Sequence, residues 1–122
     1  MFTETKAFSG FAVDDVEKAR EFYEGTLGLE VSEEHGMLTL HIAGDRPTLF
    51  YPRPNHVPAE YTILNFPVDD VEAAVDELTA RGVEFERYEG FDQDERGIHR
   101  EGPPIAWFRD PAGNVLSVIQ VD

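Results

Sequence analysis

Apolar and polar positions follow a regular order in the first half of the chain. Apolar residues alternate with others over 6–13, which predicts a β-strand because its side chains point to opposite faces in turn. An acidic pair, Asp14 and Asp15, then precedes apolar residues at helical spacing, and such residues are good N-caps. Short apolar segments at 29–32, 37–43 and 48–51 complete a predicted β-α-β-β-β order.

The second half repeats this order. Residues 66–74 match 11–19 at seven of nine positions, 55 residues later, so the chain holds two copies of one supersecondary unit. Two copies are too few for a solenoid. The same signals predict a strand at 61–68, a helix capped by Asp69 or Asp70 that ends near Gly82, and strands at 83–88, 105–109 and 115–121. Residues 89–104 mix Gly, Asp, Arg and Pro, which favours a long loop.

Because side chains alternate between the two faces of a strand, the residues of the first strand in each copy can be assigned to one face or the other. Phe8, Gly10 and Ala12 share one face, and Phe11 and Val13 share the other. In the second copy one face carries Tyr61, Ile63 and Asn65, and the other carries Leu64, Phe66 and Val68. Trp107 and Phe108 are consecutive, so they lie on opposite faces of one strand, and core packing explains them about as well as ligand stacking does.

Composition narrows the class of protein. A chain of 122 residues with 41% hydrophobic residues suits one compact domain, which we divide into module one (1–52), a Pro-containing linker (53–60) and module two (61–122). Zero cysteines exclude disulfides, thiolate metal sites and a Cys nucleophile, and together with the lack of a long apolar run they favour a cytoplasmic protein.

The net charge of −15 argues against nucleic acid or an anionic membrane as a partner. It leaves two interpretations open: a solubilising surface, or attraction of a cationic ligand. Charge alone does not separate them.

The duplicated unit resembles the vicinal oxygen chelate superfamily, which includes glyoxalases, bleomycin-resistance proteins and extradiol dioxygenases. The resemblance rests on Val13 to Tyr23, on Leu27-Gly28-Leu29, on Leu78 through Gly82-Val83, and on the turn Asp110-Pro111-Ala112-Gly113-Asn114. These motifs cover nearly the whole chain. They imply an α+β fold of two tandem βαβββ modules, whose open, barrel-like mixed sheet surrounds a cavity with the helices outside.

The same resemblance implies where a metal would be bound. Metal-using members hold one divalent ion through His, Gln or Glu at four inward positions, which here carry Phe8, Ile63, Ser117 and a residue at or beside Phe50. Phenyl and alkyl side chains cannot coordinate such an ion, and a neutral Ser is a poor ligand. We therefore expect no metal ligands at this site and no divalent-metal cofactor.

Other chemistry is weakly supported by the sequence. The histidines at 35, 41, 56 and 99 do not pair at metal-binding spacing, and no nucleophile elbow or phosphate-binding glycine loop is present. Asp94, His99 and Glu101 lie in the predicted long loop, where a general-base role competes with simple solvation. No catalytic residue is assigned.

The function expected from this pattern is binding of a small organic molecule in a metal-free apolar cavity, with sequestration of an antibiotic as one hypothesis. The expected ligand-binding residues are Phe8, Phe50, Tyr61, Ile63, Asn65, Trp107 and Ser117. One alternative is a lyase, isomerase or dioxygenase that uses a relocated metal or acid–base catalysis. Another is a domain whose cavity is filled by its own side chains. The resemblance also implies a homodimer.

Overall fold

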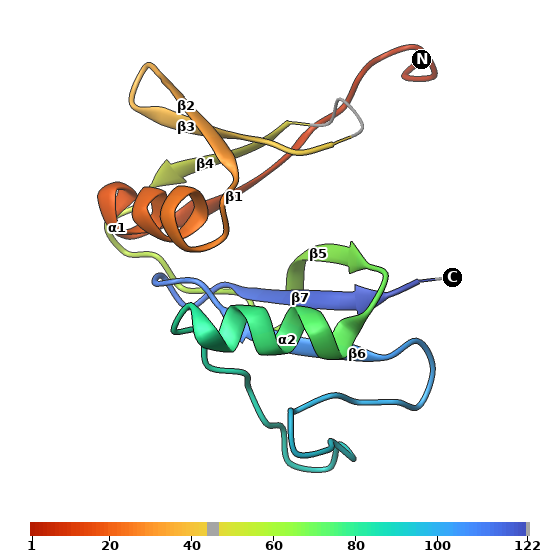
Figure 1. The fold of residues 1–122 in the computed structure, drawn as a ribbon. Coiled ribbons are helices and arrows are strands. Elements are labelled where there is room, and N and C mark those ends of the chain that lie inside the picture. Colours follow the sequence, from red (N-terminus) through yellow and green to blue (C-terminus); the bar gives the residue numbers. More distant parts are fainter. Residues whose placement is uncertain (44–46, 122) are drawn as a thin grey trace. The chain divides into compact units, whose positions relative to one another are not determined.

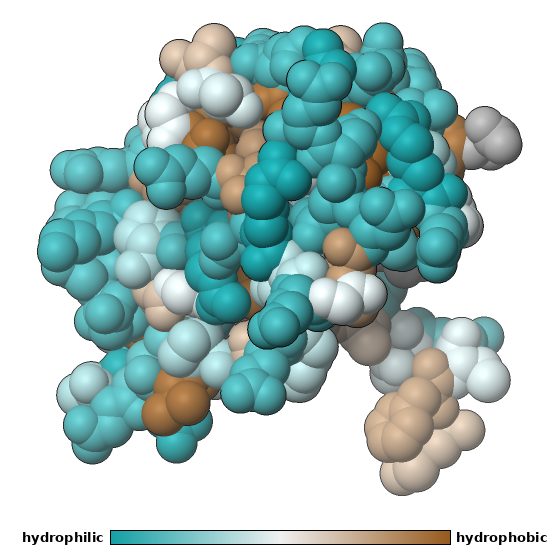
Figure 2. All heavy atoms as spheres, turned by 90° about the horizontal axis from the view of Figure 1, so that it is seen from below, coloured by the Kyte–Doolittle hydropathy of each residue, from teal (hydrophilic) through white to brown (hydrophobic). Residues whose placement is uncertain are grey.

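The structure, a computed structural model, describes residues 1–43 and 47–121 (Figure 1). It divides into two compact units, residues 1–57 and 58–122, and each unit is described by itself. Both units combine helix with a mixed sheet, so the predicted α+β class is confirmed. The space-filling view shows a face covered mainly by hydrophilic residues, with hydrophobic atoms in small separate patches (Figure 2). No helix among the described residues combines the length and apolar character needed to cross a membrane.

Unit 1 contains a four-stranded sheet in the order β1-β4-β3-β2. Strand β1 is parallel to β4, whereas β3 is antiparallel to both β4 and β2. The elements are β1 (Ser9–Val13), α1 (Val16–Arg20), the π-helix η1 (Glu21–Thr26), β2 (Glu30–Glu34), β3 (Met37–His41) and β4 (Thr48–Pro52). The predicted β-α-β-β-β order is therefore confirmed in this unit.

The core of unit 1 lies between the helix and one face of the sheet. Phe11, Phe50 and Leu38 form one cross-strand row on that face. The ring of Phe11 stacks on Phe50 with centroids 5.7 Å apart, and Tyr23 of η1 packs against Phe50 at 5.5 Å. Asp15 begins the helix, because its Oδ1 accepts a hydrogen bond from the backbone N–H of Lys18 at 3.2 Å.

Unit 2 contains a three-stranded sheet in the order β5-β7-β6, with β5 parallel to β7 and β6 antiparallel to it. Its elements are β5 (Thr62–Val68), α2 (Val71–Ala80), β6 (Ile105–Arg109) and β7 (Val115–Gln120). Asp70 caps α2 by accepting from the backbone N–H of Ala73 at 3.1 Å, as Asp15 does in unit 1. The buried residues Val71 and Val75 give α2 its apolar face, and α2 contacts β6 and β7.

Two local predictions for unit 2 need correction. Residues 83–88 do not form a regular strand; they keep one bridge, Phe85 to Phe108, and one hydrogen bond from Glu86 N–H to the Trp107 carbonyl at 2.7 Å. In β5 the register shifts between Thr62, which pairs with Val115, and Leu64, which pairs with Leu116. Ile63 is thus the extra residue of a β-bulge, and simple alternation fails at this point.

Candidate functional site

One face of the unit 2 sheet is free of α2 and is organised in cross-strand rows. Register places Trp107, Ser117 and Asn65 in one row. Ser117 is fully buried, and its hydroxyl donates a hydrogen bond of 2.5 Å to the Asn65 amide oxygen. The neighbouring row holds Arg109, Val115 and Thr62. The helix-facing side carries Phe108, which is fully buried.

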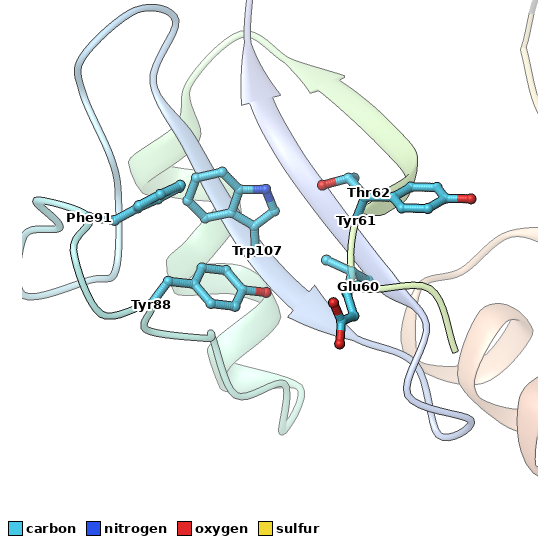
Figure 3. Close-up of a pocket in the computed structure, with 7 residues that line it drawn as sticks. Glu60, Tyr61, Thr62, Tyr88, Phe91 and Trp107 are labelled. Carbon is cyan, nitrogen blue, oxygen red and sulfur yellow. The ribbon is translucent and has the colours of Figure 1, made fainter. Parts of the chain in front are cut away.

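A pocket of about 360 Å³ opens on this face (Figure 3). Its lining comes from the start of β5, from the segment after residue 83, and from β6 and β7. The lining residues are Glu60, Tyr61, Thr62, Tyr88, Phe91, Trp107 and Val115. In Figure 3 the indole nitrogen of Trp107 is turned toward Thr62, and the hydroxyl of Tyr88 points toward the Glu60 carboxylate. Mostly aromatic walls with a few polar groups are typical of small-molecule sites.

Three of these aromatic rings form a corner. Tyr88 and Phe91 each lie 5.5 Å from Trp107, with interplanar angles of 71° and 60°. Tyr88 and Phe91 are 6.0 Å apart at 70°. His99 packs behind them, 5.2 Å from Phe91 and 6.0 Å from Trp107. Edge-to-face pairs of this kind are favourable beyond their buried area, so the corner is preformed.

The segment that carries Phe91 has no regular secondary structure but is held by side-chain hydrogen bonds. The Gln93 amide accepts from Tyr88 N–H at 2.7 Å and donates to the carbonyls of Glu86 and Gly97 at 2.9 and 2.8 Å. Arg87 donates to the Asp94 carbonyl at 2.8 Å. The loop is therefore built as a defined structure around its polar side chains.

An ion-pair cluster ties this loop to α2. Arg96 donates to Asp76 through Nε at 2.9 Å and through a terminal nitrogen at 3.2 Å, and it also reaches Glu72 at 3.3 Å. The hydrogen bond from Arg96 lowers the pKa of Asp76. Burial alone would raise the pKa of Asp94, but hydrogen bonds from Ile98 N–H, Arg100 and Arg96 N–H outweigh it and the pKa is lowered. Asp94 thus stabilises the loop as a carboxylate.

The hydroxyl group of Tyr88 stays protonated at neutral pH and can donate a hydrogen bond. Burial raises the pKa of its hydroxyl, and the nearby Arg109 guanidinium, which is hydrogen-bonded to it, only partly offsets that effect. Arg109 is itself engaged by the Glu86 carboxylate and by the Gly113 carbonyl, to which it donates at 2.8 Å. The phenol therefore stays protonated at neutral pH, since its ordinary pKa is already near 10.

The residues expected from the sequence are only partly brought together. Tyr61 and Trp107 line the pocket. Asn65 and Ser117 lie on the same sheet face, in the Trp107 row, but outside the lining. Ile63 is displaced by the bulge, and Thr62 takes the pocket-facing position beside Val115.

The two expected residues of unit 1 lie elsewhere. Phe50 has no exposed surface and packs between Phe11 and Tyr23, so its assignment to a ligand-binding face is wrong. The strand alternates, and Leu49 and Tyr51 take the opposite face with Gly10 and Ala12. Phe8 is 64% exposed and lines a separate pocket of about 330 Å³ with Ala7, Ser9, Pro47 and Thr48.

Sequence reasoning missed most of the pocket. Glu60 lay in the predicted linker, and Tyr88 and Phe91 lay in segments described as a strand and a loop. Val115 was assigned to the last strand without a face. A signal was present in the density of aromatic residues between positions 85 and 108, but only the loop geometry brings Phe91 onto Trp107.

The family's usual metal site does not fit these residues. Phe8, Phe50 and Ile63 carry no donor atom, and the Ser117 hydroxyl is already engaged with Asn65. Within residues 1–43 and 47–121, no three His, Asp or Glu side chains gather in a way that would hold a metal ion. We therefore derive no metal-dependent step.

The model of the Glyoxalase/Bleomycin resistance protein/Dioxygenase superfamily matches residues 7–118. The chain belongs to this superfamily. Its α+β fold with two mixed sheets is consistent with the two βαβββ modules of that superfamily. No curated protein matches the chain.

Solved structures of the superfamily resemble the chain over nearly its whole length. The antibiotic-binding protein TnmS3 from Streptomyces sp. CB03234 is 25% identical, with a TM-score of 0.68, and covers 98% of this chain and 99% of its own. A bleomycin-binding protein solved with bleomycin is 24% identical, with a TM-score of 0.68 and coverages of 95% and 98%. The fosfomycin resistance protein FosX from Mesorhizobium loti is 13% identical, with a TM-score of 0.67 and coverages of 98% and 93%. The last two likenesses concern the fold alone.

Proposed function

We propose that this protein binds a small organic molecule in the aromatic pocket of unit 2 and acts by sequestering it. The observation that carries the proposal is the corner of Tyr88, Phe91 and Trp107, which is preformed and opens into about 360 Å³. A preformed apolar pocket with a few directed polar groups binds ligands without a large ordering cost. The likeness to TnmS3, an antibiotic-binding protein, supports an antibiotic as the ligand.

The proposal includes function without a divalent metal, because the residues at the family's ligand positions do not fit one. It also includes a homodimer, which the family resemblance implies, and a cytoplasmic location, which the lack of cysteines favours. The acidic composition favours the absence of a nucleic-acid or membrane partner. No observation in the pocket specifically favours catalysis. The raised pKa of Tyr88 makes its hydroxyl a donor and not a base at neutral pH.

Fluorescence of Trp107 tests the proposal directly, since this residue is the chain's single tryptophan and lies in the pocket wall. Chelator-treated protein should be titrated with bleomycin and with a panel of aromatic antibiotics. We expect saturable, stoichiometric quenching by at least one compound, and the compound should be recovered chemically unchanged. Absence of binding by every compound at high micromolar concentration would contradict the proposal, and conversion of the bound compound would favour an enzyme.

A further inference from the structure

We propose that the pocket of unit 2 selects a ligand carrying an alkylated ammonium group, and that Glu60 together with the aromatic corner recognises it. This inference rests on the proposed function, because it specifies the chemistry of the molecule bound there. Three features support it: the sign of the charge at the pocket, the orientation of the rings, and the engagement of the nearby cation.

Among the described residues that line the pocket, Glu60 alone is of a type that carries a formal charge at neutral pH. Its side chain lines the pocket, and the Tyr88 hydroxyl is turned toward the side on which the Glu60 carboxylate lies (Figure 3). No Lys, Arg or His belongs to the lining that the structure describes. An anionic ligand would therefore meet repulsion from Glu60 with no cation in the wall to compensate for it.

Arg109 lies on the same sheet face and is hydrogen-bonded to the Tyr88 hydroxyl, but its charge is compensated. Its Nε is bound to the Glu86 carboxylate, and a terminal nitrogen donates to the Gly113 carbonyl at 2.8 Å. The formal charges of Arg109 and Glu86 cancel, which leaves that of Glu60. The overall charge of −15 adds a long-range field of the same sign, so a cation is drawn toward the pocket.

The ring orientations favour a rounded cation over a flat aromatic group. The planes of Tyr88, Phe91 and Trp107 meet at 60–71°, so their faces point in different directions and do not form a parallel slot. A flat aromatic group can pair with such faces offset-stacked or edge-to-face, but it has only two faces of its own. A trimethylammonium group, by contrast, can touch several differently oriented π-faces at once, and Trp provides the strongest such face.

An isosteric series separates charge from shape. Choline, its neutral isostere 3,3-dimethylbutan-1-ol and the anionic 3,3-dimethylbutanoate present nearly the same rounded group with different charge. Each should be titrated into the ¹⁵N-labelled full chain, with the single indole N–H signal of Trp107 as the readout. We expect choline to bind about tenfold or more tightly than the alcohol, as several cation–π contacts predict, and the carboxylate to bind most weakly.

A pair of variants tests whether the carboxylate of Glu60 causes the preference for choline. Glu60→Gln keeps the size of the side chain and removes the carboxylate, so the preference of choline over the alcohol should fall by about three- to tenfold. Glu84→Gln is the matched control, because Glu84 is an exposed residue of the same unit outside the pocket lining. It removes one negative charge, as Glu60→Gln does, and should leave the preference unchanged.

The outcomes separate this inference from the proposed function. Equal affinity for choline and the alcohol, or an equal effect of both variants, would overturn the ammonium assignment. So would a lack of choline binding by protein whose Trp107 signal still responds to an aromatic antibiotic. If neither the series nor any antibiotic perturbs Trp107, the proposed function itself fails.

Discussion

The two sheets present unlike open faces, although both units begin with the same repeat. Asp15 and Asp70 cap their helices through equivalent hydrogen bonds. At the repeat position of Asn65, unit 1 has Gly10, and a Cβ at Gly10 would lie 3.1 Å from the Leu49 carbonyl oxygen. Unit 1 therefore brings two backbones close together where unit 2 places an amide that binds Ser117.

The pockets differ more than their volumes suggest. The unit 1 pocket of about 330 Å³ is lined by one aromatic ring, Phe8, and by no charged side chain among the described residues. The unit 2 pocket of about 360 Å³ has four aromatic side chains and Glu60. The two units thus share the helix caps and the parallel pairing of their first and last strands, while the side chains of their open faces and the loop after residue 88 differ.

The largest expected effect concerns the core of unit 1. Phe50→Ala should lower the free energy of unfolding by about 3–5 kcal/mol, because it removes a fully buried ring that packs on Phe11 and Tyr23. Tyr51→Ala, on the opposite face, should cost about 1 kcal/mol. Denaturant unfolding measures both. A larger cost for Tyr51→Ala would mean that the assignment of the two faces is reversed.

The next effect concerns the unit 2 pocket. Trp107→Leu should weaken ligand binding by about 2 kcal/mol, or about thirtyfold, since it removes the ring that Tyr88 and Phe91 both contact. Calorimetry provides the affinity once the fluorophore is lost. Phe8→Leu is the control in unit 1 and should leave the affinity unchanged. Equal losses from both variants would contradict a site built in unit 2.

The two caps should show the same smaller effect. Asp15→Ala and Asp70→Ala each remove a side-chain acceptor from a helix N-terminus, so each should lower the free energy of unfolding by about 1 kcal/mol. Asp70→Asn keeps an acceptor and should recover most of the loss. A clear inequality between the two alanine variants, measured by chemical denaturation, would show that the repeated motif does not act alike in the two units.

The smallest effect concerns the ion pairs of the loop. Arg96→Gln should return the pKa of Asp76 upward toward its ordinary value, because the hydrogen bond from Arg96 is the main cause of its lowering. A carboxyl with a lowered pKa in the folded state stabilises it above the ordinary pKa, and this contribution is lost as the pH falls through the folded-state value. Carboxyl ¹³C titration measures the shift, and an unchanged Asp76 pKa would refute the assignment.

The sequence predicted the elements better than the site. Alternation, helical spacing, the acidic pairs and turn residues were sufficient for β1 to β7 and α2, because these signals are local. Residues 83–88 read as a strand but keep a single bridge, since Arg87 and the Gln93 side chain bind backbone groups of the loop instead. Secondary-structure propensity depends on neighbouring residues in the sequence, so it does not predict hydrogen bonds with side chains farther along the chain.

Two of the residues predicted to bind the ligand, Ile63 and Phe50, were misplaced for definite physical reasons. The bulge at Ile63 reverses the alternation, so Thr62 and not Ile63 lies beside Val115 in the pocket. An extra residue of this kind has no sequence signature in an apolar strand. Phe50 was placed by a family position on the last strand of the first module, where a shift of one residue exchanges the two faces.

The measurement that tests the central claim most directly is amide chemical-shift mapping of the ¹⁵N-labelled full chain during ligand titration. With bleomycin or choline, we expect the largest changes at residues 60–62, 88, 91 and 115 and at the Trp107 indole, which line the unit 2 pocket. Residues 10, 12, 49 and 51 on the open face of unit 1 should change least. Largest shifts in those unit 1 strands would contradict the claim that the repeated scaffold carries its ligand site in unit 2.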